Sequence, residues 1–339
     1  MISNYLGSGT YGCTIRPSFD CDIKKNLLID KTIAKIFSNK NYYKDEIKQH
    51  LLISKIDKNN SFTIKLINHC KIDLSYINKN VNNFDRCKLI KNNKIIYQII
   101  YEDGGIDLEV FFTQKRPNFD SYQFLKKFIS LFYGIQLLIN NELSHSDIKM
   151  DNLLFNGEKI ILIDFGLLIK FKELLNDRIA KINYKNIYFY PDEYNLYYKN
   201  NLFNQLLNSD ELFSRIDEYM YLIEHLSNQY NYLNYFQQIN NLNSYLKSQA
   251  FLFASKFNKT TLNKKKEELC ILFGKKLDIY QLGIVLYSII LSIIYLYDIN
   301  EINKIPLGIF DIIKKMLEPD VNIRIDIQTL INNYSKLFT

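Results

Sequence analysis

The sequence predicts a mixed α+β fold in two parts, a small β-rich part followed by a larger and mostly helical part. Short β-like runs and turns fill the first 100 residues, whereas long apolar patterns with helical spacing dominate after residue 120. The Gly104-Gly105 pair directly follows a buried apolar run and marks a break between the two parts. We therefore place the first part at residues 1–103 and the second at residues 104–339.

The individual elements follow from the spacing of the apolar residues. Thr32–Phe37 alternates apolar and polar positions and is rich in β-branched side chains, which predicts a strand. Tyr42–Ile56 has apolar residues at helical spacing and predicts a helix. The other expected elements are a buried strand at Lys94–Glu102, a strand in the run EKIILIDFG, and helices over residues 120–143, 278–297 and 309–317.

Residues 194–277 differ from the rest of the second part. They are rich in Asn, Tyr, Leu and Lys, have no glycine before Gly274, and contain helical patterns such as Asp210–Leu226. We predict a helical insertion here and favour a structural extension of the fold over a dedicated binding module.

The composition indicates a folded protein and says little about its partners. Of the 339 residues, 47% are hydrophobic and 23% are charged, which suffices for a core and argues against disorder. The net charge of +7 suits an anionic ligand or an acidic partner, but ordinary surface lysines explain it equally well, and no specific nucleic-acid partner is indicated. The five cysteines show no C-x-x-C spacing and suggest neither a disulfide framework nor a zinc site, so we expect a reducing, intracellular compartment.

Neither a secretory signal nor a membrane span is expected. Residues 1–20 are polar and contain no apolar run of the kind that a signal peptide needs. The longest apolar run, Leu282–Tyr297, lies between Asp278 and Asp298 and is shorter than the roughly 18–20 residues that a span requires. We predict that this run is a buried helix.

Three glycines near the N-terminus have G-x-G-x-x-G spacing: Gly7, Gly9 and Gly12. Glycine lets backbone N–H groups approach phosphate oxygens because no Cβ stands in the way. Dinucleotide-binding folds share this spacing, but the β-branched pair that follows here favours strand–turn–strand over strand–turn–helix. A plain hairpin turn is the competing interpretation of this stretch taken alone.

A lysine on a strand and a glutamate on the next helix form a second candidate group. Lys35 lies in the predicted strand, and a lysine that faces a phosphate needs a carboxylate to hold it. Glu46 is placed to do so in the following helix, and Asp45 is its competitor. Taken alone, a lysine on a strand is usually a surface residue, so the assignment depends on the rest of the pattern.

The run HSDIKMDN carries the strongest chemical signal. Asp147 can accept a proton from an incoming hydroxyl, and Lys149 can neutralise a phosphoryl group in transfer. Asn152 offers a carbonyl oxygen to a metal, and Asp164 at the end of the later run LIDFG offers a carboxylate. Magnesium prefers such oxygen ligands, so these residues together predict phosphoryl transfer. A polar loop that arose by chance is the alternative.

Taken in order, these motifs resemble those of a eukaryotic-type Ser/Thr protein kinase. Lys149, two residues after Asp147, matches the Ser/Thr pattern rather than the Tyr pattern. The resemblance covers nearly the whole chain except about residues 194–277 and implies a bilobal kinase-like fold, with a β-rich N-lobe and a helical C-lobe. The matching motifs are GSGTYG, Lys35, Glu46, HSDIKMDN, DFG, YPDE at Tyr190–Glu193, DIYQLGIVLY at Asp278–Tyr287 and EPDVNIR at Glu318–Arg324.

The resemblance also implies cofactors, a substrate and a set of site residues. ATP and Mg²⁺ are the expected cofactors, and a protein hydroxyl is the expected acceptor. The implied catalytic residues are Lys35, Glu46, Asp147 and Lys149, and the implied metal ligands are Asn152 and Asp164. The implied ATP-binding residues are Leu6, Gly7, Ser8, Gly9, Thr10, Tyr11, Gly12, Thr14, Lys35, Tyr101, Glu102 and Asp107. The implied structural residues are His145, Phe165, Gly166, Glu193, Asp278 and Arg324.

Two subgroups of this family are similar in detail. The run YEDGGIDLE resembles the hinge of haspin-like kinases, which makes Tyr101 the gatekeeper, Glu102 the start of the hinge and Asp107 a ribose contact. The run GSGTYGCTIRPSFDC is similar to kinases of large nucleocytoplasmic DNA viruses. That resemblance implies a viral protein of the host cytoplasm or the virion.

The chain departs from the family pattern in ways that bear on regulation. Ser146 stands where most members have an Arg that pairs with a phosphorylated activation-loop residue. The segment 166–193 contains no Ser or Thr, so we expect activity without phosphorylation of Ser or Thr there. The usual Thr before Tyr190–Glu193 is also missing, which puts the usual mode of peptide docking in doubt.

Two other functions remain open on the sequence alone. A kinase-like phosphotransferase that acts on a small molecule shares the His-x-Asp motif and the later metal Asp. Such folds usually lack the glycine-rich loop and a pair of the Glu193–Arg324 type, both of which are expected here. A pseudokinase scaffold usually loses one of Lys35, Asp147, Asn152 or Asp164, and all four are present.

Overall fold

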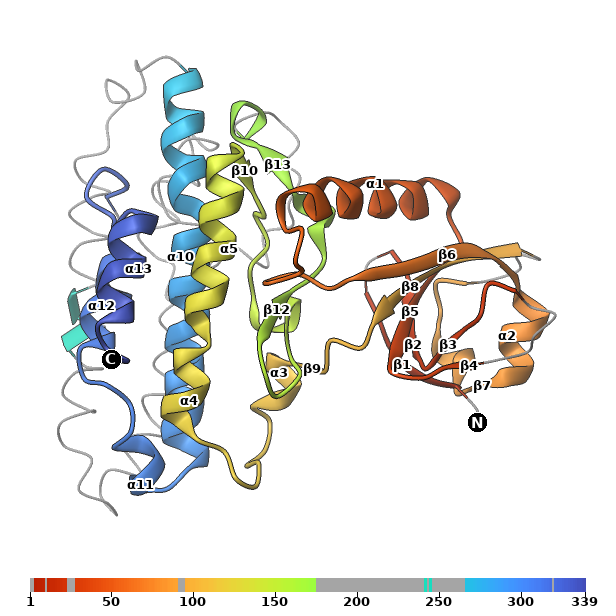
Figure 1. The fold of residues 1–339 in the computed structure, drawn as a ribbon, viewed down its shortest axis with the longest axis horizontal. Coiled ribbons are helices and arrows are strands. Elements are labelled where there is room, and N and C mark those ends of the chain that lie inside the picture. The colour runs from red at the N-terminus through yellow and green to blue at the C-terminus, as the bar shows by residue number, and fades with distance from the viewer. Residues whose placement is uncertain are drawn as a thin grey trace. The chain divides into compact units, whose positions relative to one another are not determined.

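The computed structural model describes residues 3–9, 11–22, 28–90, 95–174, 241–242, 244–245, 266–318 and 320–339. The fold is mixed α+β, as predicted, and the chain divides into two compact units (Figure 1). Unit 1 comprises Met1–Gly105 together with Phe155–Gly157 and Ile161–Gly166, and unit 2 comprises the remainder. The predicted helix over 210–226 lies outside the described residues.

Unit 1 is built on a six-stranded sheet with the order β6-β8-β5-β2-β1-β7. Its strands pair antiparallel except β1 and β7, which run parallel. The sheet strands are β1 (Ser3–Ser8), β2 (Cys13–Arg16), β5 (Thr32–Phe37), β6 (Leu66–Asp73), β7 (Val81–Asn82) and β8 (Ile95–Glu102). The other elements are a small pair of strands, β3 (Ser18–Phe19) and β4 (Leu28–Ile29), the helices α1 (Lys40–Ile56) and α2 (Leu74–Asn80), and the 3₁₀ turn η2 (Phe84–Arg86).

The predicted strand at Thr32–Phe37 and the predicted helix after it are confirmed. Helix α1 begins two residues earlier than the apolar pattern indicated, because Asn39 caps it by accepting a hydrogen bond from the Asn41 N–H at 2.8 Å. Its buried residues, Tyr43, His50 and Ile53, lie on one face, and the helix contacts β5 and β8.

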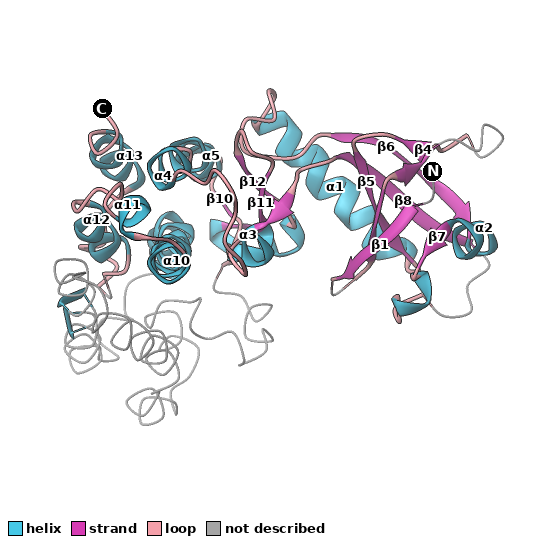
Figure 2. Ribbon diagram, turned by 90° about the horizontal axis from the view of Figure 1, so that it is seen from below, coloured by secondary structure: helices cyan, strands magenta, loops and turns pink. Residues whose placement is uncertain are grey.

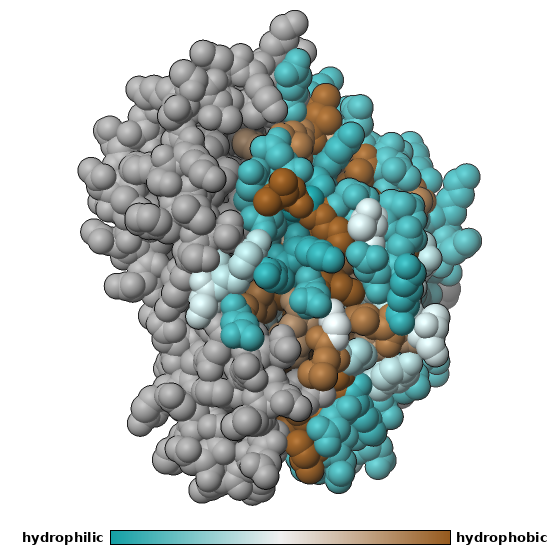
Figure 3. Space-filling view, turned by 90° about the vertical axis from the view of Figure 1, so that its left-hand side faces the viewer, coloured by the Kyte–Doolittle hydropathy of each residue, from teal (hydrophilic) through white to brown (hydrophobic). Residues whose placement is uncertain are grey.

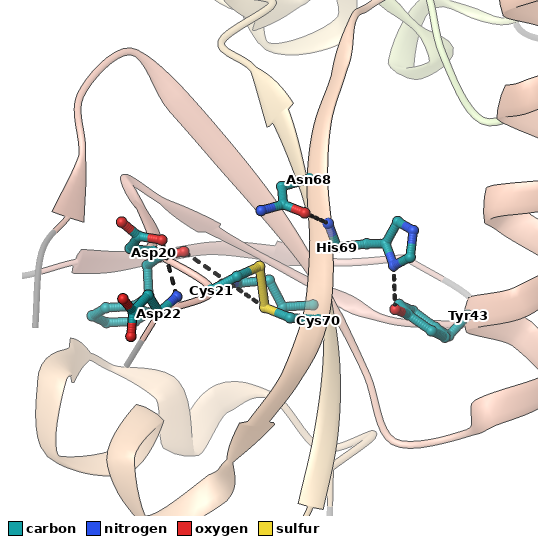
Figure 4. Close-up of a disulfide and its surroundings, with 9 residues drawn as sticks. Asp20, Cys21, Asp22, Tyr43, Asn68, His69 and Cys70 are labelled. Atoms are coloured by element: carbon teal, nitrogen blue, oxygen red, sulfur yellow. Dashed lines mark hydrogen bonds between the residues drawn. A yellow bond between two sulfur atoms is a disulfide. The ribbon is translucent and has the colours of Figure 1, made fainter. Parts of the chain in front are cut away.

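The cysteine prediction is wrong, because unit 1 contains two disulfides. They join Cys13 to Cys87 and Cys21 to Cys70, and Cys270 is a buried free thiol. The partners are 74 and 49 residues apart, and in each pair one cysteine lies on a sheet strand (Cys13 on β2, Cys70 on β6) and the other outside the sheet, so the tertiary fold brings them together. Figure 4 shows that Cys70 points toward Cys21, whereas the preceding residue, His69, points to the other side of β6 and hydrogen-bonds Tyr43.

The described part of unit 2 is mostly helical. The predicted helix over 120–143 is two helices, α4 (Ser121–Lys126) and α5 (Phe128–Asn140), which meet at Lys127. Helices α5 and α10 (Lys266–Leu296) contact each other and lie side by side in Figures 1 and 2. The other helices after residue 105 are α3 (Leu108–Phe111), α11 (Ile299–Ile302), α12 (Ile309–Met316) and α13 (Ile327–Ser335). The short strands are β9 (Ile106–Asp107), β10 (Leu143–Ser144), β11 (Leu153–Phe155), β12 (Ile160–Leu162) and β13 (Ile169–Lys170), and the 3₁₀ turns are η3 (Met150–Asn152), η4 (Phe165–Leu167) and η5 (Phe171–Glu173). Of these, β11, β12 and η4 each include residues of unit 1.

Helix α10 corrects one predicted boundary. It begins at Lys266, so the last twelve residues of the predicted insertion, Lys266–Leu277, belong to this helix rather than to an inserted segment. Close packing holds its first half in place, because a Cβ at Gly274 would overlap the ring of Phe171. Tyr245 is one of the few other described insertion residues, and its hydroxyl donates a hydrogen bond to Glu318 of unit 2.

One helix within the described ranges is long and apolar enough to cross a membrane, namely Cys270–Leu296. The protein itself buries 78% of its most apolar window, which is typical of a core helix. The described part of the surface in Figure 3 is largely hydrophilic, with apolar side chains interspersed.

Candidate active site

Unit 1 brings together three of the predicted site residues. The Nζ atom of Lys35 on β5 lies 2.9 Å from both carboxylate oxygens of Glu46 on α1 and 3.8 Å from Oδ1 of Asp164. Asp45, the competitor of Glu46, is exposed. Burial lowers the pKa of Lys35, but the carboxylates of Glu46 and Asp164 outweigh it and raise the pKa above its ordinary value. The protonated Lys35 side chain is therefore fixed in position by the Glu46 carboxylate and lies close to the carboxylate of Asp164.

Asp164 has a backbone conformation that few residues adopt. Its φ is +60°, in the left-handed region, and this turn directs its carboxylate toward Lys35. Phe165 is buried, whereas the Asp164 side chain remains 37% exposed. Gly166 packs closely against the Asp164 side chain, since a Cβ at residue 166 would lie 3.1 Å from Oδ1 of Asp164. The Gly166 carbonyl accepts a hydrogen bond from the Gln49 side chain of α1.

A buried aspartate fixes the segment that supports this strand. Asp57 follows α1, is 3% exposed, and accepts five hydrogen bonds from Ser61, Phe62 and Thr63 at 2.8–3.1 Å. The loop so formed presents the Phe62 carbonyl to the N–H of Leu162 at 2.7 Å, two residues before Asp164. Asp57 therefore contributes indirectly to the position of the Asp164 carboxylate.

We expect Asp57→Asn to lower the free energy of unfolding by about 1–3 kcal/mol at neutral pH, because the amide NH₂ would face backbone donors. Burial raises the pKa of Asp57, but the hydrogen bonds from Ser61, Thr63 and Phe62 outweigh it and depress the pKa below 3.8. The stabilisation is thus full above that ordinary value and is lost as the pH falls through the lower folded-state pKa. Urea unfolding between pH 7 and pH 3 should show the two proteins converging in acid.

The control for this prediction is Asp30→Asn, which changes an exposed turn residue of the same unit. It should shift the unfolding free energy by less than about 0.5 kcal/mol at every pH. A constant difference between wild type and Asp57→Asn down to pH 3 would contradict the proposed depression of the pKa.

The glycine-rich stretch forms the expected strand–turn–strand hairpin. β1 pairs antiparallel with β2, and the Gly9 N–H donates to the Gly12 carbonyl at 2.9 Å across the turn. Gly12 is required by packing, because a Cβ there would lie 2.6 Å from the Ile36 carbonyl oxygen. Gly7 and Gly9 meet no such restriction within the protein, since the first has nothing within 4 Å and the second only the Gly12 oxygen at 4.0 Å.

Other predicted ATP-binding residues of this hairpin are placed as follows. Thr14 of β2 pairs with Lys35 of β5 and shares its half-buried face. Tyr11 is partly exposed near the turn and packs against Tyr42 of α1 with ring centroids 4.6 Å apart. Leu6 and Ser8 are exposed on β1, and Thr10 lies outside the described residues.

The segment after β8 is held by side chains that the sequence did not single out. Arg16 of β2 donates to Asp103 Oδ1 at 2.8 Å and to the Gly105 carbonyl at 2.9 Å. The same Asp103 oxygen accepts the Gly105 N–H at 3.0 Å, and the Glu102 N–H donates to the Lys65 carbonyl. These contacts hold residues 102–105 in one conformation.

Asp107 has a structural role of its own. Its carboxylate caps α3 by accepting the Val110 N–H at 2.7 Å. This capping uses one carboxylate oxygen, Oδ1, and contact with a ribose stays a prediction.

Unit 2 brings together the residues of the HSDIKMDN run. Asn152 is buried on η3 and donates from Nδ2 to the backbone carbonyl of Asp147 at 2.8 Å and to its Oδ2 at 2.9 Å. Lys149 Nζ lies 3.5 Å from Oδ2 of Asp147 and 3.5 Å from the carboxylate of Asp151. Burial lowers the pKa of Lys149, but the Asp147 and Asp151 carboxylates outweigh it and raise the pKa. Asp147 is thus a partly buried carboxylate (22% exposed) that lies next to the ammonium group of Lys149.

Two side chains of helix α10 hydrogen-bond this loop and fix its backbone. Asp278 is buried and accepts hydrogen bonds from the Ser144 hydroxyl at 2.8 Å, the His145 N–H at 2.8 Å and the Ser146 N–H at 3.0 Å. Burial raises the pKa of Asp278, although His145 and the backbone N–H groups oppose this shift. Gln281, one turn further, accepts the Ile148 N–H at 3.1 Å and donates to the Ser146 carbonyl at 3.2 Å.

Ser146 is enclosed in the protein. It is 1% exposed, its φ is +65°, and its hydroxyl lies 3.0 Å from that of Ser144. The Ser146 side chain itself therefore does not reach the surface.

Two further residues were predicted to have structural roles, Arg324 and Glu193. Arg324 is buried, donates from Nε to the Glu318 carbonyl at 2.8 Å, and lies over the Tyr280 ring at 4.9 Å. Glu193 lies outside the described residues, as does the segment 175–200, so the expected pair stays a prediction.

Sequence reasoning missed Gln281, Asp57, Arg16 and the hydroxyl of Tyr101. Gln281 carried a signal, because it follows Asp278 by three residues and therefore shares its helix face. Asp57 also carried one, since Ser61 and Thr63 closely follow it in the sequence. Arg16 carried none, because its partner Asp103 is 87 residues away.

Each unit offers one oxygen donor of the kind that magnesium prefers, and the described ranges contain no group of three His, Cys, Asp or Glu residues that could hold a metal alone. Asp164 supplies a partly exposed carboxylate, and Asn152 supplies an amide oxygen, since its hydrogen bonds to Asp147 use the nitrogen. Magnesium bound with substrate phosphates commonly uses only one or two protein ligands. Comparison of the sequence with protein-family models and with curated proteins gives no match.

Proposed function

We propose that this protein is an ATP-dependent protein kinase that phosphorylates Ser and Thr hydroxyls. The observation that carries the proposal is the Lys35–Glu46–Asp164 cluster, in which one lysine contacts both oxygens of a helix carboxylate and approaches a second carboxylate from a left-handed turn. A surface lysine needs no such arrangement. Phosphoryl transfer needs mainly positioning and neutralisation of charge, and a held lysine provides both for a phosphate.

The predicted site residues have distinct roles in this proposal. Lys35 binds and orients the phosphates, and Glu46 holds Lys35. Asp147 accepts the proton of the acceptor hydroxyl, and Lys149 neutralises charge on the transferred group. Gly7 and Gly9 leave room for backbone N–H groups to approach phosphate oxygens, which agrees with the open space around them. Asn152 and Asp164 would hold Mg²⁺, which screens the phosphate charge when bound.

The kinase is proposed to be active without phosphorylation of its own loop. Ser146 is buried and carries no charge, so it offers nothing to a phosphoryl group. The segment 166–193 offers no Ser or Thr as an acceptor. Both observations favour a catalytic loop that is held by internal contacts, such as those from Asp278 and Gln281.

The test is transfer of labelled γ-phosphate from MgATP to casein, to myelin basic protein and to the enzyme itself, followed by phosphoamino-acid analysis. We expect label on Ser or Thr with the wild type purified after phosphatase treatment, and loss of label with Asp164→Asn. Nucleotide binding without any protein label would refute the protein-kinase proposal and favour a small-molecule acceptor or a scaffold. Label on Tyr alone would refute the Ser/Thr assignment.

A further inference from the structure

The hydroxyl of Tyr101 lies at the candidate active site, where the resemblance implied that this residue is the gatekeeper and an ATP-binding residue but gave its hydroxyl no role. It is 3.3 Å from Glu46 Oε1, the same oxygen that accepts a hydrogen bond from Lys35 at 2.9 Å. Tyr101 is on β8 and is 6% exposed, so its hydroxyl is almost shut off from water. A buried hydroxyl needs a partner, and Glu46 on α1 is that partner.

The direction of the phenol is set by its surroundings. Tyr101 pairs with Ile33 of β5 on one side and Leu66 of β6 on the other, so its backbone is fixed inside the sheet. Its ring lies 5.4 Å from that of His50, one turn after Glu46 on α1, and His50 in turn accepts the Leu66 N–H at 3.2 Å. Burial, and next the Glu46 carboxylate, raise the pKa of Tyr101 well above its ordinary value, so the hydroxyl stays a donor.

Displacement of α1 from the sheet would break two contacts to the Glu46 carboxylate. The Tyr101 hydroxyl would lose its acceptor, and Lys35 would lose the carboxylate that contacts it with both oxygens. The Tyr101 hydroxyl would lose its acceptor even if Lys35 formed an ion pair with Asp164, whose Oδ1 lies 3.8 Å from Nζ. The hydroxyl therefore adds a penalty to α1 displacement that is independent of Lys35.

We propose that Tyr101 is a positioning residue that holds Glu46, and through it α1, in the arrangement that orients Lys35. This proposal rests on the kinase function proposed above. In this proposal a hydrogen bond within the protein fixes the position of α1. Such a contact does not depend on a phosphorylated loop, to which the buried and uncharged Ser146 offers no ion pair. The acting group is the hydroxyl, because the ring alone would serve equally well as packing.

The test is Tyr101→Phe, which keeps the ring against His50 and removes only the oxygen. Loss of a hydrogen bond to a charged group corresponds to about a tenfold to hundredfold change in an equilibrium, so we expect kcat to fall at least tenfold. The KM for ATP should change less than threefold, because only the oxygen is removed. In a Glu46→Gln background, Tyr101→Phe should add less than a twofold loss, because its effect acts through the carboxylate.

The matched control is Tyr97→Phe, which removes a phenol oxygen from the same face of β8 four residues earlier, where the ring packs on Tyr43. It should leave kcat within twofold of the wild type. A tenfold loss for Tyr101→Phe in both the wild-type and Glu46→Gln backgrounds would overturn the proposal, as would no loss in either.

A second measurement does not depend on catalysis. Hydrogen exchange of the α1 amides should be at least fivefold faster in Tyr101→Phe than in the wild type, and unchanged in Tyr97→Phe. An inactive wild type whose α1 amides still respond in this way would refute the kinase function and leave the contact established. Unchanged α1 exchange in Tyr101→Phe would refute the positioning role itself.

Discussion

Replacement of Asp147 by Asn is expected to lower the kcat of phosphoryl transfer by about 10²–10⁴-fold while the protein stays folded. Asp147 Oδ2 is contacted by both Asn152 and Lys149, so an amide oxygen in that position can still accept from both. The amide nitrogen then occupies the position of the other carboxylate oxygen. That nitrogen cannot accept a proton from an acceptor hydroxyl, and the reaction loses its base.

The matched control for this variant is Asp151→Asn. Asp151 lies at the same 3.5 Å from Lys149 as Asp147 does, so its replacement removes an equal charge from the lysine without removing the base. We expect a loss of less than about tenfold in kcat. Single-turnover assays with saturating MgATP, together with thermal unfolding of each variant, separate chemistry from folding. Equal losses in the two variants would show that the charge around Lys149, rather than proton acceptance, accounts for the effect.

The local patterns in the sequence predicted unit 1 well because its main elements have strong periodicity. The strand at Thr32–Phe37 has the predicted bounds, and the strand at Ile95–Glu102 and helix α1 differ by one or two residues. Helix α10 was predicted too short because its first turns, Lys266–Leu277, mix charged residues with the apolar ones and were assigned to the insertion. The predicted helix over 120–143 breaks at Lys127, and no Gly or Pro there marks the break.

In the candidate site, too, contacts between residues close in the sequence could be predicted, whereas contacts between distant residues could not. Asp147 and Asn152 belong to one short motif and lie together because few residues separate them. Contacts between residues far apart in the sequence have no local signal, and the two disulfides and the Arg16–Asp103 pair are of this kind. They depend on strand order, which periodicity does not encode.

Replacement of Gly105 by Ala is expected to lower the stability of unit 1 by about 2–6 kcal/mol. The φ of Gly105 is +92°, a conformation that costs an L-residue about 1–3 kcal/mol. An added Cβ would also overlap the Phe155 carbonyl oxygen and lie 2.6 Å from Phe155 C and 2.7 Å from Asn156 Cα. These are backbone atoms, so no flexible side chain can move to relieve the contact.

The displacement would reach residues with which Gly105 shares its hydrogen bonds. The Gly105 carbonyl accepts from Arg16, and its N–H donates to Asp103, so a shift of residue 105 weakens the conformation of residues 102–105. A nucleotide that binds this segment through its backbone would lose affinity in the same variant.

Gly157→Ala is the control that separates backbone strain from overlap. Its φ is +93°, nearly the same as that of Gly105, but nothing lies within 4 Å of the position of its Cβ. It should therefore cost only the strain of about 1–3 kcal/mol. Because two units need not unfold together, hydrogen exchange of the β5 and β8 amides is the appropriate measure of unit 1 stability. If the two variants destabilise these strands equally, the approach of Phe155 to Gly105 is not a tight contact, and the glycine is required only for its φ.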